Sequence, residues 1–207
     1  MGLLTLFKRR ESQPAAGAPG IGASLTAEDY MAAGAELMGQ GLYEEALEEF
    51  RLAVRETPDC AAAFYNMGLI HDQLGRYRKS AECYEQAARI DPDFAEAHSR
   101  LGLARGRVGE NHEAVRSCLR AIRLDPSYIE GYDNLATTFF NMGSYPEAVK
   151  ACNKALALDP DHAPAHYTLG LIHLDLKDKA SASEEHRILK GLDPSLSEQL
   201  YHLIISG

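Results

Sequence analysis

Histidine and cysteine are the residue types in this sequence whose side chains could bind a metal ion or act as nucleophiles. The 207-residue chain contains eight histidines and four cysteines, but it has no Cys-x-x-Cys pair and no His-Glu-x-x-His motif. Gly-rich phosphate-binding loops and Gly-x-Ser-x-Gly nucleophile turns are also missing. We therefore predict that the protein has no catalytic residues, no metal site and no cofactor, and that it is not an enzyme.

The spacing of these residues indicates a structural repeat instead. Pairs of them lie 34 residues apart or at a multiple of 34: Cys118 with Cys152, His71 with His173, and His98 with His166. Equivalent positions of stacked units are too far apart for a disulfide, whose Cα atoms usually lie within about 7 Å. We expect the two cysteines to be small buried apolar residues and the histidines to occupy core and aromatic positions of the repeat.

Prolines and glycines follow the same period. The prolines of this series, four of which follow an aspartate, are Pro58, Pro92, Pro126, Pro160 and Pro194. Two glycine series are Gly34, Gly68, Gly102 and Gly170, and then Gly41, Gly75, Gly109 and Gly143, the second of which lapses at Lys177. Several residue types in phase over five units establish an internal repeat.

Each unit is predicted to form two helices. In the second unit, residues 61–74 place Phe64, Gly68 and His71 on one helical face, and residues 77–90 resume the pattern after Gly75. A proline then ends the second helix, because it lacks an amide donor and disfavours helical backbone in the residue before it. One such hairpin cannot bury its apolar face alone, so the units must stack.

These residues resemble the tetratricopeptide repeat family over residues 27–196. The family pattern appears in the second unit as Phe64, Met67, Gly68, Gly75, Tyr77, Ser80, Tyr84, Ala87 and Pro92. The resemblance implies an all-α fold, a right-handed α-solenoid of stacked helix-turn-helix hairpins. Its five units would be 27–60, 61–94, 95–128, 129–162 and 163–196. The third unit departs from the pattern at Arg105 and Asn111. The fifth departs at Lys177, Lys179 and His186, which predicts a looser last hairpin.

The two ends of the chain differ from the repeats. Residues 1–26 are rich in Ala, Gly, Ser and Pro, as in a flexible segment, and the tip 1–10 joins apolar residues to Lys8, Arg9 and Arg10. That tip is either a disordered end or a short anchor making weak membrane-surface contact. Residues 197–207 are predicted to form a capping helix that opens with a Ser195-x-x-Glu198 box, or alternatively a helix that docks a partner.

Composition limits the function further. With 21 basic and 30 acidic residues the net charge is −9, which argues against nucleic acid as a partner. No apolar run reaches the roughly 18 residues of a membrane-spanning helix, and no secretory signal is visible. We predict a cytoplasmic protein, with a location at the periphery of a membrane as the alternative.

The first helices of stacked units are expected to line a concave groove. Residues two beyond the aromatic position should point into it, and so should their preceding neighbours. Apolar and charged residues on the same helices complete the predicted peptide-binding set, which is Tyr65, Asn66, Leu69, Arg100, Leu103, Arg107, Asp133, Asn134, Phe140, Tyr167 and Leu171.

Asparagine in such a groove can grip the backbone of an extended peptide, because its amide both donates and accepts hydrogen bonds. Asn66 and Asn134 resemble the asparagine ladder of O-linked N-acetylglucosamine transferases, which Arg100 interrupts here. A carboxylate clamp of the kind in chaperone-adaptor repeats is incomplete, because Met31 and Ala35 replace its residues. The alternative is that both asparagines are solvated surface residues.

The leading hypothesis is therefore a non-catalytic adaptor or scaffold that binds an extended or terminal segment of another protein. An excess of basic residues in the third unit, including Arg100 and Arg107, favours an acidic feature in that segment. Two alternatives remain. One is a self-assembling scaffold, so that the chain would be a monomer or a weak homo-oligomer. The other is a regulatory subunit tethered through residues 1–10.

Overall fold

The computed structural model describes residues 25–206, which form eleven α-helices. The predicted flexible segment and its tip lie almost wholly outside these residues, and so does Gly207. The helices are α2 (Ala27–Gly39), α3 (Tyr43–Glu56), α4 (Ala61–Gln73), α5 (Tyr77–Ile90), α6 (Ala95–Arg107), α7 (Asn111–Leu124), α8 (Ile129–Asn141), α9 (Tyr145–Leu158), α10 (Ala163–Asp175), α11 (Lys179–Leu192) and α12 (Pro194–Ser206).

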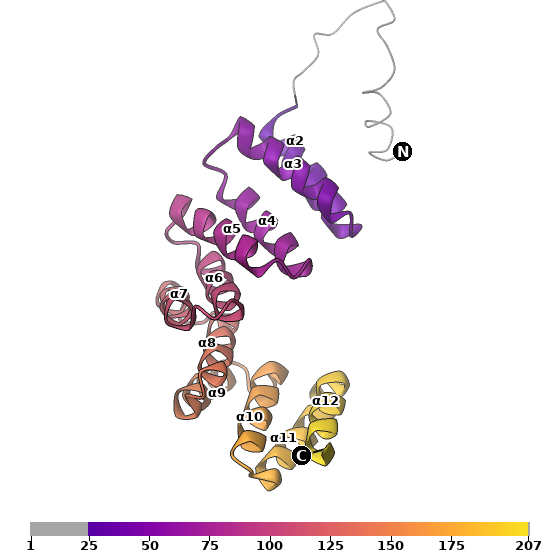
Figure 1. Cartoon of the computed structure of the whole chain (residues 1–207), viewed down its shortest axis with the longest axis vertical. Helices are drawn as coiled ribbons and strands as arrows, with labels where there is room; N and C mark the ends of the chain where they lie inside the picture. Colours follow the sequence, from indigo (N-terminus) through magenta and orange to yellow (C-terminus); the bar gives the residue numbers. More distant parts are fainter. Residues whose placement is uncertain (1–24, 207) are drawn as a thin grey trace, which may run out of the picture.

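Consecutive helices pack as antiparallel pairs, α2 with α3 through α10 with α11, and the pairs stack along an arc (Figure 1). The first helices of neighbouring pairs also pack together, as α6 does with α8 and α8 with α10. The predicted all-α solenoid of stacked hairpins is confirmed. Helices α6, α8, α10 and α12 contact one another in turn, and α2 has a smaller contact with α4. We call the surface of the even-numbered helices the inner face.

Two kinds of turn separate the helices. Within each hairpin the chain turns through a residue with positive φ, at Gly41, Gly75, Gly109 and Gly143, and glycine tolerates this conformation best. Between hairpins the aspartate before each proline accepts a hydrogen bond from the backbone N–H two residues later, as Asp125 Oδ1 does from Ser127 at 2.9 Å. The sequence period therefore repeats the turn chemistry as well as the apolar pattern.

The two helices of a hairpin approach closely where the first glycine series falls. A Cβ added to Gly68 would lie 2.5 Å from Cε1 of Tyr84, which is fully buried on the partner helix. Gly34 faces Phe50 and Gly102 faces Cys118 in the same way. The glycines are needed because the side chain sixteen residues later occupies the space of a Cβ.

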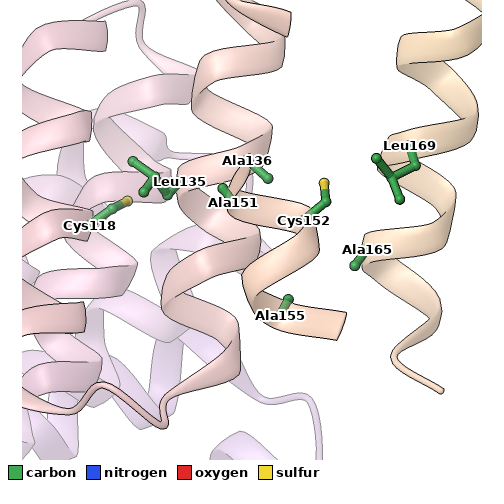
Figure 2. Packing of buried hydrophobic residues seen from close by; sticks show 8 residues of the cluster. All are labelled: Cys118, Leu135, Ala136, Ala151, Cys152, Ala155, Ala165 and Leu169. Carbon is green, nitrogen blue, oxygen red and sulfur yellow. The ribbon is translucent and has the colours of Figure 1, made fainter. Parts of the chain in front are cut away.

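The core is a series of small clusters between neighbouring hairpins. In the cluster shown in Figure 2, Ala136, Cys152 and Leu169 come from α8, α9 and α10 and point into the space between these helices. Cys118 and Cys152 are fully buried and free, which confirms their expected role as small apolar residues. The clusters hold each hairpin to the next, as a solenoid requires.

The last helix begins earlier than expected, at Pro194 instead of residue 197. The expected capping box at Ser195 does not start it. Asp193 Oδ1 accepts hydrogen bonds from the backbone N–H groups of Ser195 and Leu196, so this residue ends α11 and also caps α12. Helix α12 then packs on α10 and α11, and Leu200 fills the space in front of Gly170.

Candidate protein-binding surface

The face formed by the even-numbered helices carries the residues predicted to bind a peptide. At the ladder position, Asn66 on α4 and Arg100 on α6 are both half-buried. Within residues 25–206, no hydrogen bond is made by the Asn66 side chain and no carboxylate pairs with Arg100. The Asn66 amide is thus without a side-chain partner there, and Arg100 has a neutral hydroxyl, that of Tyr65, as its hydrogen-bond partner.

Arg100 lies in a niche of tyrosines. Tyr65 makes a side-chain hydrogen bond with Arg100; burial lowers the pKa of Arg100, and the interactions with Tyr65, Tyr84 and Tyr128 outweigh that effect and raise it. Tyr84 donates a hydrogen bond from Oη to Asp72 Oδ2 at 2.9 Å, and burial followed by this carboxylate raises the pKa of Tyr84. Burial also raises the pKa of Tyr128 to about 12. Arg100 therefore adds a positive charge beside neutral tyrosine hydroxyls, one of which, on Tyr84, is bound to the Asp72 carboxylate.

Asn134, the next ladder residue, is used within the protein. Its Nδ2 donates to Ser99 Oγ at 2.9 Å, and Ser99 on α6 is fully buried. The bond joins α6 to α8, so the expected backbone-gripping role of Asn134 is replaced in part by a contact between repeats.

Some of the residues that precede the ladder positions form joints between neighbouring first helices. In these joints the residue contacts the one that immediately precedes the next first helix. Three such contacts join residues 29 positions apart: Met31 with Cys60, Tyr65 with Phe94, and Asp133 with His162. Tyr65 and Asp133 therefore make structural contacts between helices, although the sequence placed them only in the groove. Burial raises the pKa of Asp133, and the hydrogen bond from His162 partly offsets this effect.

The remaining predicted groove residues take different positions. Leu69 packs beside Tyr84 and Leu101, while Leu103 and Tyr167 are half-buried. Arg107 is exposed, and its guanidinium carbon lies 4.7 Å from the centre of the Tyr77 ring on α5. Arg107 is therefore directed toward the neighbouring hairpin.

Phe140 and Leu171 come together in a hollow of about 350 Å³ between α8, α10 and α12. Leu174, Asp175, Lys177, Lys179 and Leu203 complete its lining. None of these five residues was predicted for the groove, although the glycine series lapses at one of them, Lys177. The hollow depends on α12 lying next to α10, and repeat phase does not specify that position.

The histidines are explained by the repeat. His98 and His166 bond through Nε2 to the carbonyl oxygens of Pro92 and Pro160, six residues earlier. Tyr132 Oη makes the same bond to Pro126. Residues 25–206 contain no group of three or more metal-ligating side chains that could hold an ion. They also contain no helix long and apolar enough to cross a membrane.

The stacked helix pairs define a helical repeat protein of the solenoid class. Sequence comparison matches the TPR repeat over residues 72–109 and 137–177, and the tetratricopeptide repeat over residues 95–128. The chain belongs to the tetratricopeptide repeat family.

Solved structures agree with this assignment of the fold. The chain is similar to MamA from Desulfovibrio magneticus RS-1, with 21% identity and a TM-score of 0.71 over 82% of this chain and 96% of that chain. TTC0263 from Thermus thermophilus, a thermophilic TPR protein, shares 19% identity with a TM-score of 0.72 over 87% and 100%. YrrB, a TPR protein with an unusual peptide-binding site, shares 21% identity with a TM-score of 0.65 over 85% and 92%. No curated protein matches the sequence.

The fold supports a general function. Tetratricopeptide repeats form protein–protein interaction scaffolds, and they are generally non-catalytic modules. What an individual member binds depends on its own surface side chains.

Proposed function

We propose that this protein is a non-catalytic adaptor that binds an extended segment of a partner protein along the face formed by its even-numbered helices. The observation that carries the proposal is the pair Asn66 and Arg100. They occupy equivalent positions of consecutive repeats, and neither side chain has a carboxylate or amide partner in the part of the chain that the structure describes.

The chemistry of this pair defines the partner segment. The Asn66 amide can donate to and accept from a peptide backbone, which gives affinity with little sequence preference. Arg100 adds a charge in a half-buried niche, where an ion pair is screened less by water than at an open surface. A segment with an acidic group near the third repeat fits this arrangement. YrrB offers a family precedent, because it is a TPR protein with a peptide-binding site.

The test is affinity capture from native lysate with the full-length chain and with the double variant Asn66→Ala/Arg100→Ala. Asn134 is left intact because its substitution would also break the contact with Ser99. The matched control is Arg123→Ala/Lys154→Ala, two exposed cations on the second helices α7 and α9. Circular dichroism shows whether each variant keeps its helices.

A protein recovered with the wild type and the control, and lost with the inner-face variant, would support the proposal. Equal recovery by all three chains would contradict it and would move the interface away from this face.

Self-assembly is the second candidate, favoured by the outer face of α12. Tyr201 is 47% exposed and Ile205 is 61% exposed, although both are large and apolar. Sedimentation velocity over a range of concentrations tests it. A mass that rises with concentration in the wild type and stays monomeric in Ile205→Glu would support assembly through α12.

A further inference from the structure

The turn between α10 and α11 contains an unusual residue. Lys177 has φ of 65°, the conformation that glycine adopts in the four equivalent turns. A side chain is unfavourable there, because its Cβ crowds the following carbonyl oxygen. Such strained positions tend to occur at functional sites. Glycine would adopt this turn at a lower energetic cost, so a function of the lysine side chain would explain its presence.

Lys177 lies at the rim of the hollow between α8, α10 and α12. The apolar side chains of Phe140, Leu171, Leu174 and Leu203 line this hollow. Its volume, about 350 Å³, falls within the usual range for sites that accept a small ligand or a large side chain. The hollow therefore offers apolar surface to a group that would lose its contact with water on entering.

The charges at the rim are uneven. Asp175 lines the hollow, but its Oδ2 accepts a hydrogen bond from Tyr145 Oη at 2.9 Å. The ammonium groups of Lys177 and Lys179 have no ion pair or hydrogen bond within residues 25–206. Two unpaired cations thus border an apolar hollow in a chain whose net charge is −9.

We propose that this hollow binds a bulky apolar side chain of the partner segment, and that Lys177 and Lys179 pair with an acidic residue next to it. The assignment rests on the proposed function and deepens it, because it defines the partner as an acidic and apolar segment. Burial of the apolar side chain supplies affinity, while the two cations select acidic neighbours and repel basic ones.

Charge also distinguishes this occupant from the other apolar segments available. The apolar tip of the chain itself is followed by Lys8, Arg9 and Arg10, which the lysines at the rim would repel. A second copy of the chain carries the same net charge of −9, which opposes association.

The experiment measures binding of three short fluorescein-labelled peptides to the full-length protein by fluorescence anisotropy. The first peptide has an Asp-Glu-Leu-Phe core in a Gly-Ser context. The second replaces the acids by Lys-Arg, and the third replaces Leu-Phe by Ala-Ala. We expect the first to bind about tenfold more tightly than either of the others.

Lys177→Gly is the decisive variant. It restores the residue that the other four turns use, so its melting temperature should equal or exceed that of the wild type. Its affinity for the first peptide should nevertheless fall about threefold to fivefold, the size expected for one partly exposed ion pair. Leu171→Ala should also weaken binding. Lys154→Ala is the matched control, because it removes an exposed cation from α9, a helix that contributes no residue to the lining of the hollow, and it should bind as the wild type does.

Equal affinity for the three peptides, or unchanged affinity in Lys177→Gly, would overturn the assignment. Loss of partner capture in Asn66→Ala/Arg100→Ala, combined with unchanged peptide affinity in Lys177→Gly and Leu171→Ala, would leave the adaptor function standing and would refute this site. A rise in peptide affinity when Leu3, Leu4, Leu6 and Phe7 are changed to Ser would make the chain's own tip the occupant. A dimer that Leu171→Ala abolishes would make it a second copy. Either result overturns the proposal.

Discussion

His162, which precedes α10, hydrogen-bonds the carboxylate of Asp133 on α8 and so joins α8 to the start of α10. Both side chains are only 17% exposed, and Asp133 Oδ1 has no hydrogen-bond partner within the described residues. The same two repeat positions are occupied by Tyr65 and Phe94, whose ring centres lie 4.9 Å apart. One joint therefore uses polar chemistry where an earlier joint uses aromatic packing.

We predict that the Asp133 joint needs a hydrogen-bond acceptor and does not need a charge. Burial raises the pKa of Asp133. A carboxyl group whose pKa is raised in the folded state adds stability below its unfolded pKa. This contribution is lost as the pH rises through the folded pKa. At neutral pH the buried negative charge of Asp133 therefore lowers the stability of the folded state. Asp133→Asn should stay within about 1 kcal/mol of the wild type in urea unfolding, while Asp133→Ala should lose about 1 to 3 kcal/mol.

The variants Asp133→Asn and Asp133→Ala differ in whether residue 133 keeps a hydrogen-bond acceptor. Asparagine retains an oxygen that can accept from His162 Nε2, whereas alanine leaves that ring nitrogen unpaired. Equal losses in Asp133→Asn and Asp133→Ala would show that the negative charge itself holds the joint.

Close helix contact at Gly68 leads to a second prediction. A methyl group at this position would lie within 3 Å of three Tyr84 ring atoms, and the ring is fully buried. Gly68→Ala should therefore destabilise the protein by about 1 to 3 kcal/mol through overpacking. Gly191→Ala in α11 is the control, because nothing lies within 4 Å of its Cβ position. There the change should stabilise by about 0.5 to 1 kcal/mol. Thermal melts of both variants check the opposite signs, and a stabilised Gly68→Ala would contradict the packing argument.

Sequence period predicted the helices and the turns between them, because these features recur along the repeats. It did not predict which residues of the even-numbered helices would make contacts with neighbouring helices instead of facing the groove. Asn134 and Asp133 were expected in the groove, yet Asn134 bonds Ser99 on α6 and Asp133 bonds His162 at the start of α10. Periodicity fixes the direction of a side chain around its helix axis, but the distance to the next helix depends on how the repeats stack.

The hollow at the fifth repeat was missed for a related reason. Phe140 and Leu171 were predicted separately as groove residues, and Lys177 was noted only as a departure from the glycine series. Leu203 completes the hollow from α12, which lies outside the 34-residue pattern. Contacts between one unit and a segment outside the repeat cannot be predicted from the repeat period.

Buried thiols lead to a third prediction, on pH. Burial raises the pKa of Cys118 and of Cys152 to about 12, from a usual value of 9.0. Three pKa units reduce the reactive thiolate about a thousandfold, so neither thiol should react with Ellman's reagent at pH 8 before the protein unfolds. Mass spectrometry of the labelled protein identifies the thiols that react. Rapid labelling of Cys118 or Cys152 in folded protein would contradict their burial.

The same shifts predict loss of stability in alkali. Because the folded pKa values are raised, their contribution is fully present below pH 9 and is lost as the pH rises toward 12. The unfolding free energy of the wild type should fall across this window. Cys118→Ala should show a shallower fall, because one of the two thiols no longer releases its proton on unfolding.

Leu200 on α12 provides the last prediction. This residue is fully buried, and its Cδ2 would lie 2.5 Å from a Cβ at Gly170. In the earlier repeats the matching space is filled sixteen residues after the glycine, as by Tyr84 opposite Gly68. In the fifth repeat that place in the sequence belongs to His186, whose Nδ1 instead lies 3.0 Å from Ser197 Oγ. Helix α12 therefore supplies the core residue that the last hairpin lacks.

Leu200→Ala should cost about 2 to 5 kcal/mol, and Ile205→Ala, at an exposed position of the same helix, should change stability by less than about 0.5 kcal/mol. Repeat arrays transmit stability mainly between neighbouring units, so the loss should be local. Hydrogen exchange should accelerate in α10, α11 and α12 of Leu200→Ala while α4 and α5 keep their protection. Uniform acceleration along the whole chain would contradict this account, because it would mean that α12 stabilises the array as one cooperative unit and not as a cap on its final hairpin.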